Sequence, residues 1–338
     1  MPEETQRGAG RSRGGRARKP PPLVAALDLG TNNCRLLIAK STRNGELRIV
    51  DSFSRIVRLG EGLAQSGMLS EVAIERTVGA LKICAEHLRN RKVKRLRAVA
   101  TEACRRAGNA DVLVARARAE TGIALEIIAA DEEARLAAVG CAPLIDPQAD
   151  GALVFDIGGG STEVIWMRRD GAGAVPRAIA AISQPAGVVT LSEGWTGGPL
   201  DRAGFARMCA AMRERFAAVK DAFARHGAFD PARHHLLGTS GTVTTLAAVA
   251  LGLPRYDRGK VDASWHRCAD IGGVIDRLVD MTLEQRAAIG CVGADRADLI
   301  VPGCAIFAAI ASLWPCAQLR VADRGLREGM LRELMGRT

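Results

Sequence analysis

Aromatic residues are scarce in this sequence, at 4% of the chain with a single Tyr. Proteins that bind single-stranded nucleic acid stack bases on exposed aromatic side chains, so the composition argues against a specific nucleic-acid partner. Acidic residues are fewer than basic ones: the chain has 37 Asp and Glu and 47 Lys and Arg, which gives a net charge of +10. Most basic residues are Arg, whose fork pairs well with phosphate oxygens, although a general preference for Arg over Lys gives the same composition. We expect a phosphate-rich substrate.

Closely spaced metal ligands are missing. Nine cysteines are present, but no two of them form a C-x-x-C pair, which argues against a zinc site and against a disulfide framework. The pair His234–His235 has no partner at ligand spacing. Scattered cysteines of this kind are typical of reduced, mostly buried thiols, so we expect a cytoplasmic protein.

Membrane-directing segments are missing as well. Residues 1–22 are rich in Arg, Gly and Pro and predict a disordered basic tail, and no apolar stretch follows that would complete a secretory signal. The longest apolar stretch is Val301–Leu319. It contains Pro302, Gly303 and Pro315 and many Ala, which favours a buried helix over a membrane span of ~20 strongly apolar residues. We expect no membrane partner.

The stretch Leu153–Met167 carries the clearest functional signal. It reads L-V-F-D-I-G-G-G-S-T-E-V-I-W-M, which predicts a strand, a tight glycine turn and a returning strand. Successive N–H groups in such a turn form a concavity that suits phosphate oxygens. Asp156 and Glu163 flank the turn, and two carboxylates beside phosphate are typical of a divalent cation site.

A second copy of this pattern lies at Val24–Ala39. Superposing Asp28 on Asp156 places Gly30 on Gly158, Asn33 on Ser161 and Arg35 on Glu163. Two ordinary glycine turns are the alternative, but here the Asp-x-Gly order and both flanking strands recur together. The chain of 338 residues is long enough for two domains, so we expect two homologous domains that face one binding site.

Further elements follow from periodicity and capping residues. The patterns predict strands over 46–54, 95–100, 125–129, 174–183 and 319–322, and helices over 70–91, 110–121, 131–139, 200–225, 243–251 and 323–334. Binding residues often lie directly after strands in α/β sheets. Three arginines have this position and are candidates for binding phosphate: Arg55, Arg58 and Arg105. The segment G-T-S-G-T at 238–242 opens a helix and is a candidate anion site.

Taken together, the motifs resemble those of the Ppx/GppA family of exopolyphosphatases and guanosine pentaphosphate phosphohydrolases. The resemblance extends from Val24 to Leu334. The matching motifs are D-L-G-T-N-N at 28–33, R-L-G-E-G-L at 58–63, A-T-E-A-C-R-R-A-x-N at 100–109, E-E-A-R at 132–135, D-I-G-G-G-S-T-E at 156–163, G-T-S-G-T at 238–242 and G-L-R-E-G at 325–329.

The resemblance implies the actin/hexokinase/Hsp70-type fold, an α/β architecture of two ribonuclease-H-like domains with a cleft between them. We place the first domain at 23–140 and the second at 141–322, with a C-terminal helix at about 323–338 that packs back on the first. The C-terminal HD-type extension of the long family members has no counterpart, so the resemblance is to the short form. A homodimer is common in the family.

The resemblance also implies roles for individual residues. Glu133 matches the catalytic Glu, and Asp156 and Glu163 match the family's metal-side carboxylates. We expect these two residues, together with Asp28, to hold Mg²⁺ or Mn²⁺. The implied phosphate-binding residues are Asn32, Asn33, Arg58 in preference to Arg55, Arg105, Gly158, Gly159, Gly160, Ser161, Thr162, Ser240 and Gly241. The first loop departs from many relatives, because Thr31-Asn32-Asn33 stands where they have Ser-Asn-Ser.

The resulting hypothesis is a hydrolase that releases terminal orthophosphate from inorganic polyphosphate. Glu133 would deprotonate a water for in-line attack on the terminal phosphorus. Three alternatives stay open: cleavage of the 5′-terminal phosphate of guanosine pentaphosphate, ATP-dependent phosphorylation of an acceptor by a kinase of the same fold, and binding of polyphosphate or alarmone without turnover.

Overall fold

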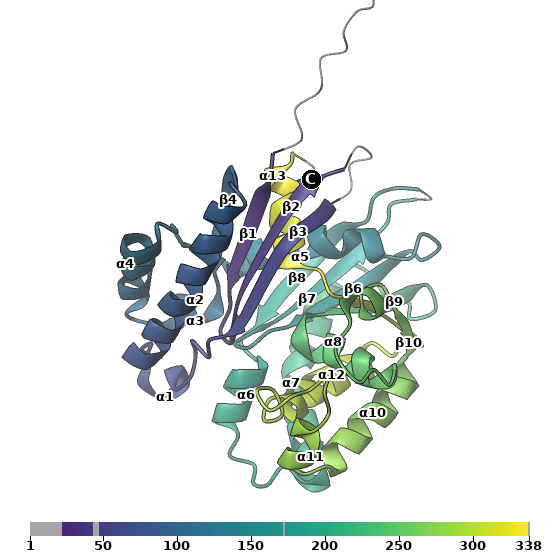
Figure 1. Cartoon of the computed structure of the whole chain (residues 1–338). Helices are drawn as coiled ribbons and strands as arrows, with labels where there is room; N and C mark the ends of the chain where they lie inside the picture. Colours follow the sequence, from purple (N-terminus) through teal and green to yellow (C-terminus); the bar gives the residue numbers. More distant parts are fainter. Residues whose placement is uncertain (1–21, 43–46, 172, 337–338) are drawn as a thin grey trace, which may run out of the picture.

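Two mixed β-sheets with helices on both sides form the framework of the computed structural model (Figure 1). The structure describes residues 22–42, 47–171 and 173–336. The predicted basic tail lies outside the described residues except for Pro22, as does Glu46 at the start of one predicted strand. Among the described helices, none combines the length and the apolar character that a bilayer span requires.

The first sheet is built around an antiparallel hairpin. Its strand order is β3-β2-β1-β4-β5, with β1 and β2 antiparallel, β2 and β3 antiparallel, and β4 parallel to both β1 and β5. The strands are β1 (Val24–Leu29), β2 (Asn33–Ser41), β3 (Leu47–Ile56), β4 (Arg95–Ala100) and β5 (Glu126–Ile127).

The second sheet repeats this arrangement and adds one strand. Its order is β10-β11-β9-β6-β7-β8, in which β6, β7 and β8 correspond to β1, β2 and β3. Strands β9 and β11 continue parallel to β6, as β4 and β5 continue from β1. The strands are β6 (Gly151–Ile157), β7 (Thr162–Arg168), β8 (Arg177–Gln184), β9 (His234–Thr239), β10 (Trp265–Arg267) and β11 (Gln318–Ala322). The predicted duplication is therefore visible in the topology.

The helices cover the faces of these sheets. The first part of the chain contains α1 (Leu63–Ser66), α2 (Glu71–Asn90), α3 (Glu102–Arg106), α4 (Ala110–Thr121), α5 (Ala130–Cys141) and η1 (Ala142–Leu144). The second part contains α6 (Val188–Gly194), α7 (Arg202–Ala224), α8 (Ser240–Ala250), α9 (Arg258–Val261), α10 (Cys268–Asp280), α11 (Leu283–Ala287), α12 (Ile300–Leu313) and α13 (Leu326–Leu334).

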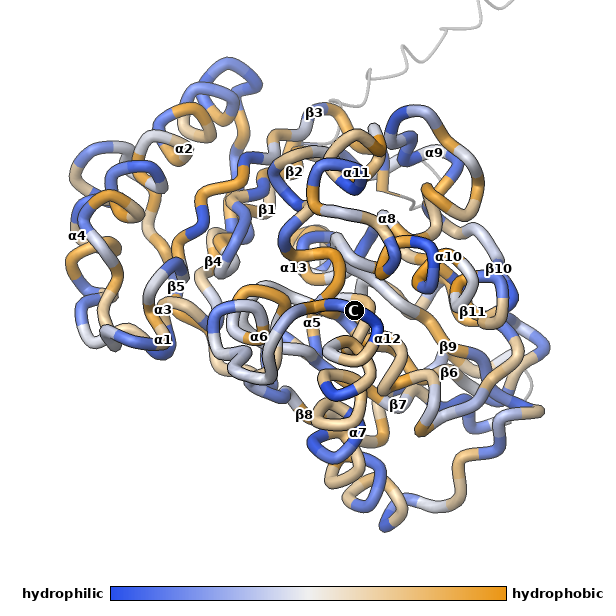
Figure 2. Tube along the Cα trace, turned by 90° about the horizontal axis from the view of Figure 1, so that it is seen from below, coloured by the Kyte–Doolittle hydropathy of each residue, from blue (hydrophilic) through white to orange (hydrophobic). Residues whose placement is uncertain are grey.

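Strand alternation places apolar side chains on both faces of each sheet. In β6, Leu153 and Phe155 join the core beneath α7, α8, α10 and α12, whereas Val154 joins the core next to α5. In β1, Leu27 packs with α2 and α4, whereas Ala26 packs with α13. The outer helices are amphipathic, as the alternating colours of α2 show (Figure 2). Sheets buried on both faces hold their edge loops in fixed positions.

Helices α5 and α13 lie side by side between the two sheets (Figure 1). Their backbones touch, because a Cβ on Gly140 would lie 2.0 Å from the carbonyl oxygen of Gly325, and one on Gly329 would lie 2.0 Å from that of Leu136. Helix α13 packs on β1 and α5 packs on β8, so this pair joins the sheets. The start of each helix is thereby brought to the edge where the hairpin turns lie.

Most predicted elements are confirmed, with differences at their ends. The predicted strand over 125–129 is reduced to Glu126–Ile127. The last helix begins at Leu326 rather than at Asp323, because the Glu328 carboxylate accepts a hydrogen bond from the N–H of Gly325 and caps the helix there. The apolar stretch from Val301 forms the buried helix α12, which ends before Pro315.

Candidate active site

The turn of the first hairpin presents polar atoms without partners. Strand β1 ends at Leu29, and the N–H of Gly30 donates to the carbonyl oxygen of Asn33 over 2.9 Å to close the turn. Among the described residues, the buried Thr31 Oγ1, Asn32 Oδ1 and Asn33 Oδ1 have no hydrogen-bond partner. Buried polar groups are almost always paired in native proteins, so three unpaired polar atoms in one turn indicate a site for a polar ligand.

The second hairpin has the same geometry. The N–H of Gly158 donates to the carbonyl oxygen of Ser161 over 2.9 Å, as Gly30 does to Asn33. Asp156 lies opposite Glu163 in the β6–β7 register, and Asp28 lies opposite Arg35 in the β1–β2 register. The predicted superposition of the two hairpins is therefore confirmed residue by residue.

Helix α6 supports the glycine turn from behind. The N–H groups at its start, on Val188 and Val189, donate to the carbonyl oxygens of Gly158 and Gly159 over 2.9 and 2.8 Å. The Thr190 hydroxyl donates to the carbonyl oxygen of Gly160 over 3.2 Å. The N–H groups of Gly159 and Gly160 donate to no acceptor among the described residues. Neighbouring N–H groups of this kind can bind the oxygens of a phosphate group.

The two turns touch each other across the gap between the sheets. A Cβ on Gly160 would lie 2.5 Å from Thr31 Oγ1 and 2.8 Å from the Cγ of Glu102, so only glycine fits there. A Cβ on Gly159 would lie 3.1 Å from the amide nitrogen of Asn32. The expectation that both turns face one site is therefore confirmed.

One cavity of about 70 Å³ lies between the turns and brings most of the predicted residues together. At about 14 Å³ for each water it holds roughly five waters, or a group of about five heavy atoms such as a phosphoryl group. Its lining contains Asp28, Gly30, Thr31, Asn32, Asn33, Arg35, Thr101, Glu102, Glu133, Asp156, Gly158, Gly159, Gly160, Ser161, Glu163, Ser240 and Leu326.

The carboxylates of this cavity have perturbed pKa values. Burial raises the pKa of Asp156 to about 6, with Asp28 adding to the rise and Arg35 opposing it. Burial also raises the pKa of Glu163 to about 7, and the charge of Asp156 adds to it. The pKa of Asp28 is likewise raised by burial against the charge of Arg35. Several carboxylates share a space with too little positive charge to stabilise all of them when ionised.

Glu133 is held in place by Arg105. The Arg105 Nη1 donates to Glu133 Oε2 over 2.8 Å and to the carbonyl oxygen of Ile128 over 3.0 Å. Its Nη2 donates to Glu102 Oε2 over 2.8 Å. Burial and the charge of Glu163 raise the pKa of Glu133 well above its usual value, despite the Arg105 guanidinium. In this structure Arg105, which was predicted to contact substrate, contacts the predicted catalytic carboxylate.

Four predicted residues do not line this cavity: Arg105, which contacts Glu133, Gly241, which lies on the wall of a neighbouring cavity, and Thr162 and Arg58. Thr162 is fully buried and its hydroxyl donates to the carbonyl oxygen of Ala186 over 2.6 Å. Arg58 forms an ion pair with Asp298 over 3.2 Å at the outer rim of the site. The neighbouring N–H groups of Val57 and Arg58 donate to the carbonyl oxygen of Asn32, so this loop supports the first turn through its backbone.

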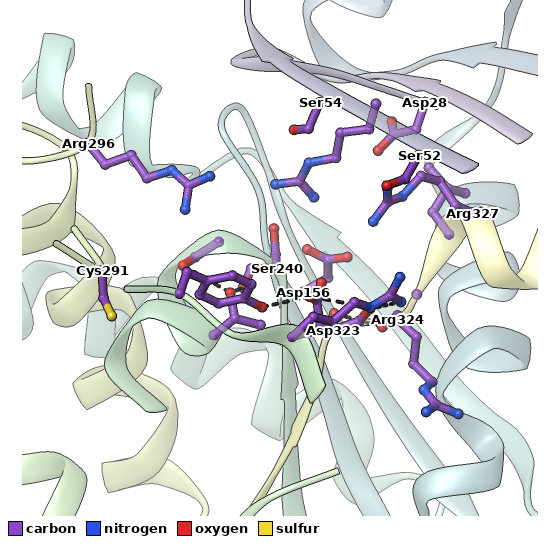
Figure 3. Close-up of a pocket in the computed structure, with 18 of the residues that line it drawn as sticks. Asp28, Ser52, Ser54, Asp156, Ser240, Cys291, Arg296, Asp323, Arg324 and Arg327 are labelled. Atoms are coloured by element: carbon purple, nitrogen blue, oxygen red, sulfur yellow. Dashed lines mark hydrogen bonds and ion pairs between the residues drawn. The ribbon is translucent and has the colours of Figure 1, made fainter. Parts of the chain in front are cut away.

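A larger cavity of about 460 Å³ adjoins the first and shares Asp28, Arg35, Asp156 and Ser240 with it. The predicted residues Ser240 and Gly241 lie on its wall at the start of α8. Figure 3 shows Arg296 extending into this space from the side opposite Arg327. The predicted site is therefore the inner end of a longer, arginine-lined space.

Sequence reasoning missed several residues of the site. Arg35 was aligned with Glu163 but given no role, and Arg327 lies in the G-L-R-E-G motif without having been singled out. Glu102 follows strand β4 directly, a position at which binding residues are expected. The support of the glycine turn by α6 left no signal in the sequence, because it depends on a contact between distant segments.

Whether a divalent cation fits the inner cavity depends on the carboxylates of Asp28, Asp156 and Glu163. Among the residues the structure describes, no three His, Cys, Asp or Glu side chains converge on one metal position. Glu163 Oε1 already accepts hydrogen bonds from the hydroxyl groups of Ser161 and Ser183 over 2.8 and 2.7 Å. Mg²⁺ commonly uses one or two carboxylates together with substrate oxygens and waters. Asp156 and Glu163 are buried carboxylates with too little positive charge around them, so their oxygens fit such a cation.

Comparison with known proteins identifies the family of the chain. The family model described as the Ppx/GppA phosphatase family matches residues 37–338. The chain is 34% identical over 328 residues to exopolyphosphatase 2 of Mycobacterium tuberculosis, a match that covers 93% of this chain and 98% of that protein.

Solved structures give the same result. A Ppx/GppA family member from Aquifex aeolicus has a TM-score of 0.77 and 32% identity, over 94% of this chain and 99% of that one. An exopolyphosphatase from Cytophaga hutchinsonii has a TM-score of 0.83 over 94% and 99% of the two chains, and at 24% identity it is evidence for the fold alone.

Fold and relatives define a phosphohydrolase of the actin/hexokinase/Hsp70-type fold, with two ribonuclease-H-like units around a shared cavity. Within that class, the chain belongs to the Ppx/GppA phosphatase family.

Proposed function

We propose that this protein releases the terminal orthophosphate of inorganic polyphosphate by attack of water on the terminal phosphorus. The observation that carries the proposal is the single cavity lined by both glycine turns and by Glu133. The name of the Mycobacterium tuberculosis relative supports polyphosphate as the substrate. A cytoplasmic location and a homodimer remain predictions.

Glu133 is the proposed general base. A base acts in its ionised form and its strength rises with its pKa, so the raised pKa of Glu133 makes its carboxylate a stronger base than an exposed glutamate. The hydrogen bond from Arg105 fixes one carboxylate oxygen of Glu133. The other oxygen would accept the proton of the attacking water.

The glycine turns are the proposed holders of the terminal phosphate. The unpartnered N–H groups of Gly159 and Gly160 and the buried Thr31 hydroxyl would donate to its oxygens. Arg35 has no close carboxylate partner among the described residues, although it reduces the pKa rise of Asp28 and Asp156. Its guanidinium is placed to bind the next phosphate along the chain.

Asp156 and Glu163, with Asp28 nearby, would hold Mg²⁺ or Mn²⁺. The cation would offset the negative charge on the phosphoryl oxygens. The hydroxyl groups of Ser161 and Ser183 fix the orientation of Glu163 by their hydrogen bonds to Oε1.

Cleavage of guanosine pentaphosphate is a second candidate. The larger cavity of about 460 Å³ next to the terminal site has Phe53 and Tyr256 on its wall, which gives space and aromatic surface for a nucleoside. Both reactions would use the same terminal phosphate site.

The test is phosphate release by the purified full chain from tripolyphosphate, long-chain polyphosphate and guanosine pentaphosphate, measured side by side with Mg²⁺ or Mn²⁺. We expect turnover of polyphosphate, loss of that turnover when a chelator removes the cation, and recovery when Mg²⁺ is restored.

Each rival predicts a different outcome of this comparison. Turnover of guanosine pentaphosphate alone would replace the proposal by the second candidate. Phosphate transfer from ATP to an acceptor, without release from polyphosphate, would favour a kinase. Binding of polyphosphate with no release under either metal would indicate a protein that only senses it.

A further inference from the structure

The side chain of Glu102 lies where the two halves of the active site meet. Glu102 is the first residue of α3 and lines the inner cavity of about 70 Å³ between the turns. Only 13% of its side chain is exposed. Glu102 is not among the residues proposed above to hold the phosphate, the cation or the attacking water. Its contacts with two neighbouring parts of the site indicate a different role.

The aliphatic part of Glu102 packs against the glycine turn of the second sheet. A Cβ on Gly160 would lie 2.8 Å from the Cγ of Glu102 and 3.1 Å from its Cβ. Gly160 is one of the two glycines whose free N–H groups are proposed to hold the terminal phosphate. Because atoms packed this closely cannot approach further, the contact fixes the position of the turn relative to the start of α3.

The carboxylate of Glu102 binds the side of the Arg105 guanidinium. Its Oε2 accepts hydrogen bonds from Arg105 Nε over 3.2 Å and from Arg105 Nη2 over 2.8 Å. The two residues stand three positions apart on α3, a spacing that brings side chains to the same face of a helix. Hydrogen bonds between two charged groups are stronger than neutral ones, and two of them fix the plane of the guanidinium.

The opposite side of this guanidinium faces the proposed base. Arg105 Nη1 donates to Glu133 Oε2 over 2.8 Å and to the carbonyl oxygen of Ile128 over 3.0 Å. With the two bonds to Glu102, these contacts use four of the five N–H groups of the guanidinium. Glu102 therefore determines where Arg105 directs its Nη1, and Arg105 determines where Glu133 lies.

We propose that Glu102 is a positioning residue for the hydrolysis: through Arg105 it holds the base Glu133 at a fixed place relative to the glycine turn that binds the terminal phosphate. The inference rests on the proposed function for the role of Glu133. In-line attack requires the water to lie between the base and the phosphorus, so a small displacement of the base lowers the rate. Glu102 contacts the turn with its aliphatic part and controls the base with its carboxylate.

The first test is the steady-state kinetics of two Glu102 variants with polyphosphate. We expect Glu102→Ala to lower kcat by about 20-fold, because Arg105 loses half of its hydrogen bonds and the base shifts. KM should not rise, since no contact with the chain is lost and one negative charge near it is removed. Unchanged kcat in Glu102→Ala would overturn the proposal.

The conservative variant separates positioning from a direct role of the charge. The amide oxygen of Glu102→Gln can accept both N–H groups of Arg105, and its aliphatic part still packs against Gly160. We therefore expect Glu102→Gln to keep kcat within about fivefold of the wild type. A Glu102→Gln protein as slow as Glu102→Ala would overturn the proposal, because the charge itself would then be required, as it is in a cation ligand.

A double-mutant cycle tests whether Glu102 acts through Arg105. In a protein that already carries Arg105→Ala, adding Glu102→Ala should lower kcat by less than about twofold, because no guanidinium remains to be oriented. A second loss of about 20-fold would show that Glu102 acts independently of Arg105, and it would overturn the proposal.

The matched control is Asp270→Ala. Asp270 accepts hydrogen bonds from the Nε and Nη2 of Arg267 over 2.9 and 2.7 Å, again between residues three positions apart. This pair is exposed and lines neither of the two cavities described above, so kcat should stay at the wild-type value. A loss equal to that of Glu102→Ala would mean that the effect is not specific to the site, and it would overturn the proposal.

A crystal structure of the Glu102→Ala protein gives a readout that does not depend on turnover. We expect the Arg105 guanidinium to turn and its hydrogen bond to Glu133 to be lost. A guanidinium that keeps its place against Glu133 and Ile128 would overturn the proposal. If the wild-type protein releases no phosphate from polyphosphate while Arg105 leaves Glu133 in this variant, the proposed hydrolysis fails and the positioning of Glu133 by Glu102 stands.

Discussion

Replacing Glu133 with glutamine is expected to slow phosphate release from polyphosphate by about 10²–10⁴, the usual contribution of a general base. Glutamine keeps the size of the side chain and its contact with Arg105, but it cannot accept a proton from water. Steady-state kinetics should show the loss in kcat with KM little changed, since the group acts on the reacting water and not on chain binding.

The neighbouring carboxylate supplies the control. Glu132 stands one residue earlier on α5 and forms ion pairs with Arg97 and Arg135 over 2.9 and 2.7 Å, away from the cavity. Glu132→Gln should therefore leave phosphate release close to that of the wild type. A Glu133→Gln protein with undiminished kcat would remove Glu133 from the chemistry.

Replacing Gly187 with alanine is expected to reduce kcat/KM by about 10²-fold, although the residue touches no substrate. A Cβ at this position would lie 2.4 Å from both the carbonyl carbon and the carbonyl oxygen of Gly159. Because the obstacle is backbone, no rotamer change can relieve it, and the turn that holds the phosphate must shift. We expect a loss of about 1–3 kcal/mol in the free energy of unfolding as well.

The effect should come from this contact and not from backbone conformation, since Gly187 has φ −110° and ψ 173°, which alanine adopts freely. Gly194→Ala, at the other end of the same helix, is the matched control, because a Cβ there meets nothing within 4 Å. The measurements are thermal unfolding and steady-state kinetics of the Gly187→Ala and Gly194→Ala proteins. A fully active Gly187→Ala protein would show that α6 does not set the position of the turn.

The sequence was sufficient for the parts of the site that are local. The strand–turn–strand pattern around Asp156, and its copy around Asp28, predicted both hairpins and the equivalence of their positions correctly. A turn of this kind is fixed by residues only a few positions apart, so its geometry is encoded in a short segment. The duplication then implied that both turns share one site, which the common cavity confirms.

Contacts between distant segments could not be predicted in the same way. The partner of Arg58 is Asp298, 240 positions further along the chain, and nothing in the local pattern around Arg58 indicates it. Thr162 belongs to the predicted phosphate loop, but strand alternation turns its hydroxyl toward Ala186. Arg105 follows strand β4 as expected, yet the nearby carboxylates of Glu102 and Glu133 occupy its guanidinium.

The central claim is that the two glycine turns and Glu133 surround the terminal phosphate of a polyphosphate chain. The most direct measurement is a crystal structure of the Glu133→Gln protein with tripolyphosphate and Mg²⁺. The account predicts a terminal phosphate between Gly158–Ser161 and Gly30–Asn33, with residue 133 beside it. A chain whose end lies outside this cavity, with the two turns empty, would contradict the account.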